Sequence, residues 1–302
     1  ACLVGSEMCI RDRNKPIITI VQDTLLGIYK LTFSELLHHK KGDRHTYANN
    51  TNLYNTSGDH DSLYVPSAVF TKKQTMNLLC NLSTFRGYIP EPEIMLDDRL
   101  PMWSGKQILS FIIPDIINLK QGNGSYDNEP VDVKNMVEII EGVIKQGAFD
   151  KGLFTKTSKG LIHTIYNDLG SDRAKSFIDD LQKIVSYFLL IEGFSVGISD
   201  MIAPQETNEK ILEVVETKKK VIEGIMQDIH LDIFENYTGQ TNKEYFESKV
   251  NSVLNETLKD TGKIGLSTLD EKNRVTAMIN SGSKGKPTNI AQIVACLGQQ
   301  NV

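Results

Sequence analysis

Two long apolar stripes with helical spacing constrain the fold of this chain more than any other feature. The first comprises Ile211, Val215, Ile222, Ile225 and Ile229, and the second comprises Phe246, Val250, Val253, Leu254 and Leu258. Apolar residues that recur every three to four positions share one face of a helix. Because the short glycine-containing segment 237–241 joins the stripes, we expect an antiparallel helical hairpin.

The rest of the chain mixes helix and strand signals. Residues 170–192 carry a third helical stripe that Gly193 ends, and residues 25–31 predict a helix capped by Asp23 or Thr24. The β-branched run 17–21 and the segment 131–145 predict strands, whereas 120–130 predicts a polar loop. We therefore expect an α+β protein with a mixed domain over residues 14–203 and a mainly helical domain over 204–302. The boundary lies at the proline-containing segment 204–207.

The first thirteen residues show no periodicity that connects them to the rest of the chain. They resemble translated sequencing-adaptor sequence, so we expect them to be non-native and leave them out of the fold.

A polar segment over residues 38–63 predicts a surface insertion. Its imidazole and carboxylate groups could form a metal site, and they come from His38, His39, His45, Asp59, His60 and Asp61. Metal ligands need a frame that fixes their geometry, and this composition supplies none. We favour a solvated loop and expect no metal ligands in this chain.

The four cysteines show no spacing typical of a metal site. Cys80 and Cys296 lie in apolar stretches, which predicts buried free thiols in a reducing compartment. No apolar run reaches the roughly 20 residues that a membrane helix needs, so no membrane partner is expected.

Charge is distributed unevenly along the second half of the chain. Residues 205–275 hold ten Lys or Arg and fourteen Asp or Glu, which argues against a nucleic-acid-binding face there. Residues 272–302 contain four basic residues and no acidic ones. A local positive field in an acidic chain favours an anion.

The glycine turn 281–286 presents a lysine within this basic segment. Gly282 and Gly285 flank Lys284, and glycine permits positive φ and a close approach to a ligand. Thr288 or Asn289 is expected to cap a helix over 290–297, whose amides would also attract an anion. An ordinary exposed turn is the competing interpretation. A Walker phosphate loop is excluded, because the spacing differs and Pro287 follows Lys286.

An ordered set of motifs resembles the largest subunit of multisubunit DNA-directed RNA polymerases, of the eukaryotic type II or large-DNA-virus kind. The motifs are Ile20–Gly27, Trp103–Ser110, Gly160–His163, Gly193–Asp200, Ser281–Gly285, Asn289–Gln292 and Gly298–Val302. The resemblance covers residues 15–302. Each motif alone is weak, and their order makes the set specific.

The resemblance implies a fragment that covers the pore and funnel regions and ends before the bridge helix. In this family these regions surround a secondary channel, through which nucleoside triphosphates (NTPs) enter and backtracked RNA leaves. The helical hairpin would dock a transcript-cleavage elongation factor. Other polymerase subunits, template DNA and the RNA transcript would be partners, in the nucleus or, for a viral member, in host cytoplasm or the virion.

The resemblance also implies roles for individual residues. Lys284 matches the basic residue that faces the NTP triphosphate, and its role would be electrostatic. Five polar residues match the neighbourhood of the channel and its inhibitor site, namely Asn255, Asn289, Gln292, Gln299 and Gln300. Leu258 stands where type II enzymes carry an arginine, and the 38–63 insertion is longer than in those enzymes.

The catalytic aspartates that hold Mg²⁺ in the full enzyme are expected outside this chain, which would then contain no catalytic residue. The alternative function is a non-catalytic helical interaction module, in which the hairpin recruits partners and the glycine loop binds an anion or is only a turn.

Overall fold

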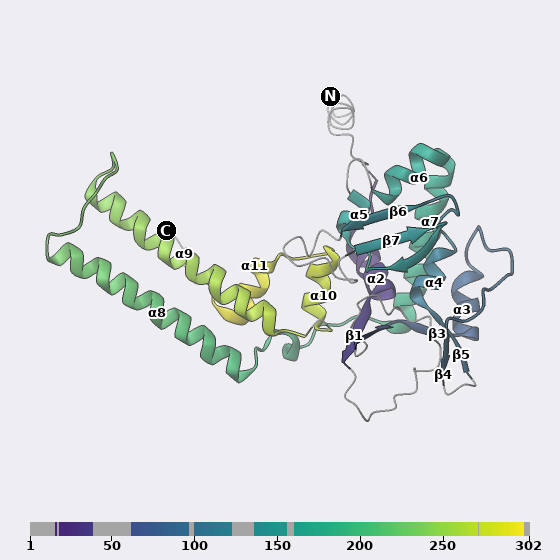
Figure 1. Cartoon of the computed structure of the whole chain (residues 1–302), viewed down its shortest axis with the longest axis horizontal. Helices are drawn as coiled ribbons and strands as arrows, with labels where there is room; N and C mark the ends of the chain where they lie inside the picture. Colours follow the sequence, from purple (N-terminus) through teal and green to yellow (C-terminus); the bar gives the residue numbers. More distant parts are fainter. Residues whose placement is uncertain are drawn as a thin grey trace. The chain divides into compact units, whose positions relative to one another are not determined.

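The chain forms two compact units, the first from residues 1–194 with 280–283 and the second from residues 195–279 with 284–302. The computed structural model (Figure 1) describes residue 16 and residues 18–38, 62–96, 100–122, 136–155, 160–270 and 272–298. The predicted non-native segment 1–13, nearly all of the 38–63 insertion, and Gln299 and Gln300 lie outside these residues.

Unit 1 combines helices with small antiparallel sheets, and the described part of unit 2 is helical, which confirms the α+β class. The elements of unit 1 are α2 (Gln22–Thr32), β1 (Ser34–His38), β2 (Ser62–Pro66), β3 (Val69–Thr71), α3 (Lys72–Leu79), β4 (Ile94–Leu96), β5 (Leu100–Ser104), α4 (Gly105–Ser110), β6 (Leu119–Gly122), β7 (Met136–Ile140), β8 (Val143–Gln146), α5 (Lys151–Thr155), α6 (Leu161–Leu169) and α7 (Ser171–Glu192).

The described strands pair with antiparallel neighbours in three sheets. Strand β1 pairs with β2, β5 lies between β3 and β4, and β7 lies between β6 and β8. Strand β1 ends at His38 and β2 begins at Ser62, so the two ends of the predicted insertion lie on paired strands. Phe70 pairs with Trp103 between β3 and β5.

Helix α7 is the central element of unit 1. Its inward face is almost fully buried, with Phe177 1% and Ile184 0% exposed. It packs against α2, α3 and α6. Gly27 of α2 allows the closest approach, because an added Cβ would collide with Cγ1 of Val185. A bulkier residue at Gly27 would force the two helices apart.

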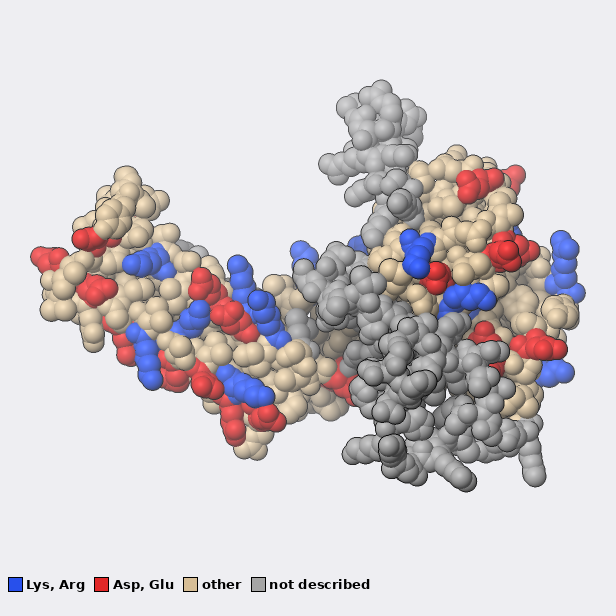
Figure 2. Space-filling model, viewed as in Figure 1, with Lys and Arg blue, Asp and Glu red and all other residues tan. Residues whose placement is uncertain are grey.

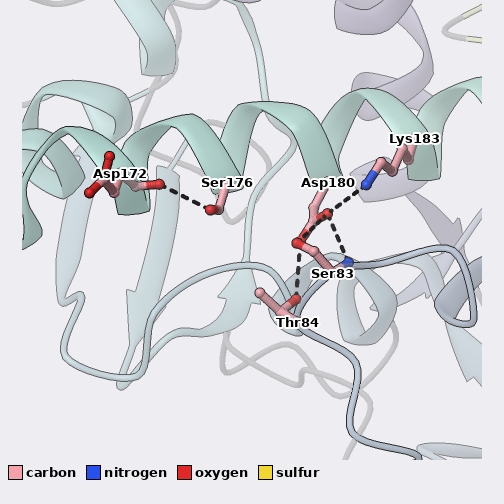
Figure 3. Close-up of polar contacts among 6 residues, drawn as sticks. All are labelled: Ser83, Thr84, Asp172, Ser176, Asp180 and Lys183. Carbon is pink, nitrogen blue, oxygen red and sulfur yellow. Dashed lines mark hydrogen bonds and ion pairs between the residues drawn. The ribbon is translucent and has the colours of Figure 1, made fainter.

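A buried carboxylate ties α7 to the segment that follows α3 (Figure 3). Asp180 accepts hydrogen bonds from the Ser83 amide (3.1 Å), the Ser83 hydroxyl (2.8 Å) and the Thr84 hydroxyl (3.2 Å). Its side chain is fully buried and pairs with Lys183 at 3.4 Å. Burial alone would raise the pKa of Asp180, but these hydrogen bonds and the Lys183 charge together lower it. The carboxylate therefore stays ionised and fixes the loop to the helix.

Several local predictions for unit 1 are wrong. The described residues 18–21 form no strand, and α2 begins at Gln22 without a side-chain cap. Thr24 instead donates to Oε1 of Gln182 at 2.6 Å. A strand requires a partner that continues its ladder, whereas Ile20 is simply buried in the core.

The segment predicted as one strand over 131–145 contains two, β7 and β8. Glu141 and Gly142 join them with positive φ angles of 50° and 74°. Positive φ at both central residues is the signature of a tight hairpin turn, and Glu141 is an unusual residue for it. The first three residues of the predicted polar loop over 120–130 belong instead to strand β6, which ends at Gly122.

Unit 2 is built around the predicted helical hairpin. Its elements are the 3₁₀ helix η3 (Ile198–Met201), α8 (Gln205–His230), α9 (Asn242–Thr268), α10 (Arg274–Ser281), α11 (Pro287–Ile290) and the π-helical turn η4 (Ala291–Ala295). Helices α8 and α9 lie side by side (Figure 1). Lys218 of α8 forms ion pairs with Glu256 at 3.0 Å and Asp260 at 3.5 Å on α9. The hairpin prediction is confirmed.

The outer faces of the hairpin are solvated. Figure 2 shows Lys and Arg side chains interspersed with Asp and Glu along both helices. The ion pairs Lys210–Glu206 and Lys219–Glu216 link neighbouring turns of α8 on this exposed surface. These charges match the solvated faces predicted from the sequence. Among the described residues, no helix is both long and apolar enough to cross a membrane.

The prediction of buried thiols is wrong. Cys80 is exposed at the end of α3, and Cys296 is half-buried after η4; both are free. The apolar neighbours of Cys80 in sequence point into the core, whereas the helix turns Cys80 itself outwards.

Candidate functional site

The glycine turn before α11 presents Lys284 to solvent. Gly282 and Gly285 adopt φ angles of 73° and 84°, which confirms the expected positive-φ backbone on both sides of the lysine. The Lys284 amide donates to the Met278 carbonyl at 3.4 Å, and its side chain is exposed. The turn thus holds the backbone of Lys284 while its ammonium group remains in water.

The helix after this turn begins earlier than predicted. Lys286 is the N-cap and Pro287 the first helical residue, in place of the expected cap at Thr288 or Asn289. Proline suits the first position because its φ is already helical and no amide is needed there. The Asn289 side chain accepts from the Lys286 amide at 2.7 Å. The predicted run to residue 297 stops at Ala295, and Cys296 is extended.

Small residues bring the C-terminal segment close to α9. An added Cβ on Gly262 would lie 2.6 Å from Cβ of Ala291, and one on Gly265 would lie 3.7 Å from Cβ of Ala295. The Thr261 hydroxyl lies 3.3 Å from Sγ of Cys296. We call this contact between α9 and α11–η4 the small-residue seam.

The remaining predicted site residues occupy different settings around this seam. Asn255 on α9 and Asn289 on α11 are exposed, whereas Gln292 on η4 is half-buried. Among the described members of the predicted set, no side chain hydrogen-bonds to another. Gln299 and Gln300 lie beyond the residues that the structure describes.

Leu258 packs against the backbone that leads to these two glutamines. Gly298 has a φ of 76°, and a Cβ added there would lie 3.2 Å from Cδ2 of Leu258. Asn255 precedes Leu258 by three residues and therefore shares its side of α9. The structure thus brings Leu258 and Gly298 into contact, one turn of α9 from Asn255.

An ion pair that the sequence did not reveal organises the start of α10. Asp200 accepts from the Gly197 amide at 2.8 Å and from Nη1 of Arg274 at 3.2 Å. The side-chain Nδ2 of Asn273 donates to the Asp200 carbonyl at 2.8 Å. The Gly197 hydrogen bond, followed by the Arg274 contacts, lowers the pKa of Asp200.

This ion pair reduces the positive field expected over residues 272–302, because Arg274 is one of the four basic residues in that segment. Asp200 closes the motif Gly193–Asp200, so the sequence indicated its importance. Its partner lies 74 positions away, which no local pattern reveals.

Unit 1 holds a buried lysine within the Trp103–Ser110 motif. Ser104 caps α4, and Lys106 points inwards, where Nζ donates to the Ser34 hydroxyl at 2.9 Å. Burial lowers the pKa of Lys106 to about 8, although the nearby Glu93 carboxylate opposes this shift. Burial likewise raises the pKa of Glu93, which accepts from the Ser104 hydroxyl at 2.7 Å. No local sequence pattern indicates that this lysine is buried.

No three metal-ligating side chains lie together within the described ranges.

Two protein-family models match the chain. RNA polymerase Rpb1, domain 3, matches residues 9–201, and RNA polymerase Rpb1, domain 4, matches residues 225–302. The first match alone spans more than half of the chain.

Proposed function

Because the chain belongs to the family of largest subunits of multisubunit DNA-directed RNA polymerases, we propose that it lines the secondary channel of such an enzyme. NTPs would pass along it towards the catalytic centre, and backtracked RNA would leave by the same route. The ordered motifs, which span both matched domains, support this role. Membership in the family favours it over a free-standing interaction module.

We propose that Lys284 contacts the triphosphate of the incoming NTP. The observation that carries this role is an exposed lysine between two positive-φ glycines, in a segment with no acidic residue from 272 onwards. Glycine lets the backbone come close to a phosphate, and the ammonium group would orient the triphosphate and offset its charge. Lys284 would position substrate without exchanging a proton.

Lys284→Ala in the assembled polymerase tests this role. We expect the apparent KM for NTPs to rise by roughly tenfold, because one lost charge contact is worth on the order of 1.4 kcal/mol. DNA binding should not change. Lys220→Ala, which removes an exposed lysine from α8, is the matched control. An unchanged KM in Lys284→Ala would rule out the triphosphate contact.

The exposed hairpin is proposed as the docking site for a transcript-cleavage factor. Its two helices are 26 and 27 residues long and carry interspersed charged side chains on the face that Figure 2 shows. Asn255, Asn289 and Gln292, with Gln299 and Gln300, are proposed to line the channel near the inhibitor site. The other polymerase subunits, DNA and RNA would be partners of the whole enzyme, in a nuclear or viral setting.

A further inference from the structure

A cavity of about 370 Å³ lies where the hairpin turns from α8 to α9. Its apolar wall is formed by Met226, Ile229, Phe234 and Phe246, and its polar rim includes His230 and Asp232. We call this the tip cavity. Its volume falls within the range of about 300–1,000 Å³ that is usual for ligand pockets.

The turn that joins the two helices lining the tip cavity is held by its own hydrogen bonds. The Asn236 side chain donates to the Gln240 carbonyl at 2.8 Å and accepts from the Thr238 amide at 2.9 Å. Thr241 and Glu244 form a capping box at the start of α9. These bonds hold the connection between the two helices whose residues line the cavity, and a preorganised site lowers the entropic cost of binding.

Asp232 on the rim occupies a backbone position that normally selects glycine. Helix α8 ends with the Ile233 amide donating to the Asp228 carbonyl at 2.9 Å and the Asp232 amide to the Ile229 carbonyl at 3.1 Å. In this arrangement the residue with positive φ is usually glycine, yet Asp232 has a φ of 61°. Backbone strain kept at a cavity rim points to a use for the side chain.

The surroundings of the tip cavity combine apolar surface with negative charge. Leu231, Ile233 and Tyr237 are 66%, 62% and 83% exposed. Residues 226–249 hold five Asp or Glu and two Lys. Of these lysines, Lys249 lies over the Phe234 ring at 5.2 Å, and Lys243 stands on the cavity rim. The net charge disfavours nucleic acid and favours a basic partner.

We propose that the tip cavity binds a partner protein through one apolar side chain flanked by basic residues. The apolar side chain would fill the space between Met226 and Phe246, and the flanking cation would pair with Asp232. The proposal rests on the proposed role of the hairpin as a docking site and specifies the chemistry of the partner. Apolar anchors in preformed pockets typically dominate binding of this kind.

Titration of the full 302-residue chain with a fluorescent lysine-rich peptide carrying one central leucine tests the cavity. We expect saturable binding, weakened by about tenfold or more when the leucine is replaced by serine or the lysines by glutamate. Asp232→Gly should also weaken binding about tenfold while the helical ellipticity is kept, because glycine relieves the strain. Met226→Ser should weaken binding in the same way.

Glu213→Gln, which removes an exposed charge elsewhere on α8, is the control and should bind as the parent does. Equal affinity for the leucine and serine peptides, or full affinity in Asp232→Gly, would overturn the proposed occupant.

A second measurement separates this inference from the docking role. In the assembled polymerase, factor-stimulated RNA cleavage should fall in both Asp232→Gly and Met226→Ser. Peptide binding with unchanged cleavage would refute docking at the hairpin and leave the cavity assignment in place. Reduced cleavage without peptide binding would support docking at the hairpin and refute an apolar side chain flanked by basic residues as the occupant of the cavity.

Discussion

Helix α7 and the α8–α9 hairpin carry the same sequence pattern but reach different depths of burial. Phe177 and Ile184 of α7 are almost completely buried, whereas Val250, Val253 and Leu254 on the apolar stripe of α9 are only half-buried. Helix α7 packs against three other helices, whereas α8 packs mainly against α9, which also contacts α11 and η4. Periodicity thus determines which face of a helix turns inwards, and the packing around that face determines how deeply it is buried.

The two regions also differ in where they place charged side chains. Unit 1 buries Asp180 and Lys106, and each is satisfied by hydroxyl groups at short distance. The hairpin places its charges at the surface, where exposed ion pairs contribute little to stability. The units should therefore differ both in their sensitivity to core mutation and in their response to pH.

The largest expected difference comes from truncating one apolar side chain in each region. Phe177→Ala should reduce the free energy of unfolding of unit 1 by about 3–5 kcal/mol, because it leaves a cavity in a closed core. Leu254→Ala should cost the hairpin only about 1 kcal/mol, since much of that side chain already contacts water.

Denaturant titration separates these two effects. Trp103 is the only tryptophan, lies 4% exposed in unit 1, and reports that unit by fluorescence. Far-UV ellipticity follows the helices, including the hairpin. Equal losses of unfolding free energy in the two variants would contradict the difference between the closed core of unit 1 and the half-buried contact between α8 and α9.

The pH response should have opposite signs in the two regions. Lys106 has a folded pKa of about 8 against an ordinary value of 10.5. Below pH 8 both states are protonated and the cost of burying the charge is complete. As the pH rises towards 10.5 the folded state loses its proton first, so unit 1 should gain about 3 kcal/mol.

Hydrogen bonding to Glu256 instead raises the pKa of Lys218. Its contribution to the hairpin is present below pH 10.5 and is lost as the pH rises through the raised folded value. The pH dependence of unfolding, followed by Trp103 fluorescence in the parent and in Lys106→Met, isolates the buried lysine. The same gain in both proteins would show that another group causes it.

The smallest effect is expected where the two regions are alike. Thr71 caps α3 in unit 1 and Thr241 caps α9 in the hairpin, each with a capping box at an exposed position. Removing either hydroxyl should cost about 1 kcal/mol. Thermal unfolding of Thr71→Ala and Thr241→Ala measures both. A loss of stability several times larger for Thr71→Ala than for Thr241→Ala would show that a cap next to the buried core is worth more than a cap on the hairpin.

The sequence predicted the long helices and the exposed lysine turn because both depend on local information. The stripes of α7, α8 and α9 have many repeats, and Gly282 and Gly285 tolerate positive φ without help from distant residues. Short elements were less predictable. Glu141 adopts positive φ in the β7–β8 turn although only Gly142 marks it, and the run before α2 resembles a strand but has no partner within the described residues.

Contacts between distant residues lay outside what any sequence pattern could show. Asp180 meets Ser83 across 97 positions, and Asp200 meets Arg274 across 74. Tertiary structure alone brought these pairs together, neutralising part of the basic segment and setting the pKa of each carboxylate.

The sequence by itself determined the class of fold, the hairpin, the positive-φ glycines beside Lys284 and the resemblance to a polymerase subunit. These follow from periodicity, backbone chemistry and motif order, which are properties of short stretches of chain. Only the tertiary structure decided that Lys106 is buried and that a cavity forms at the hairpin tip. Both depend on how side chains from separate elements exclude water, because burial is a property of the packed molecule.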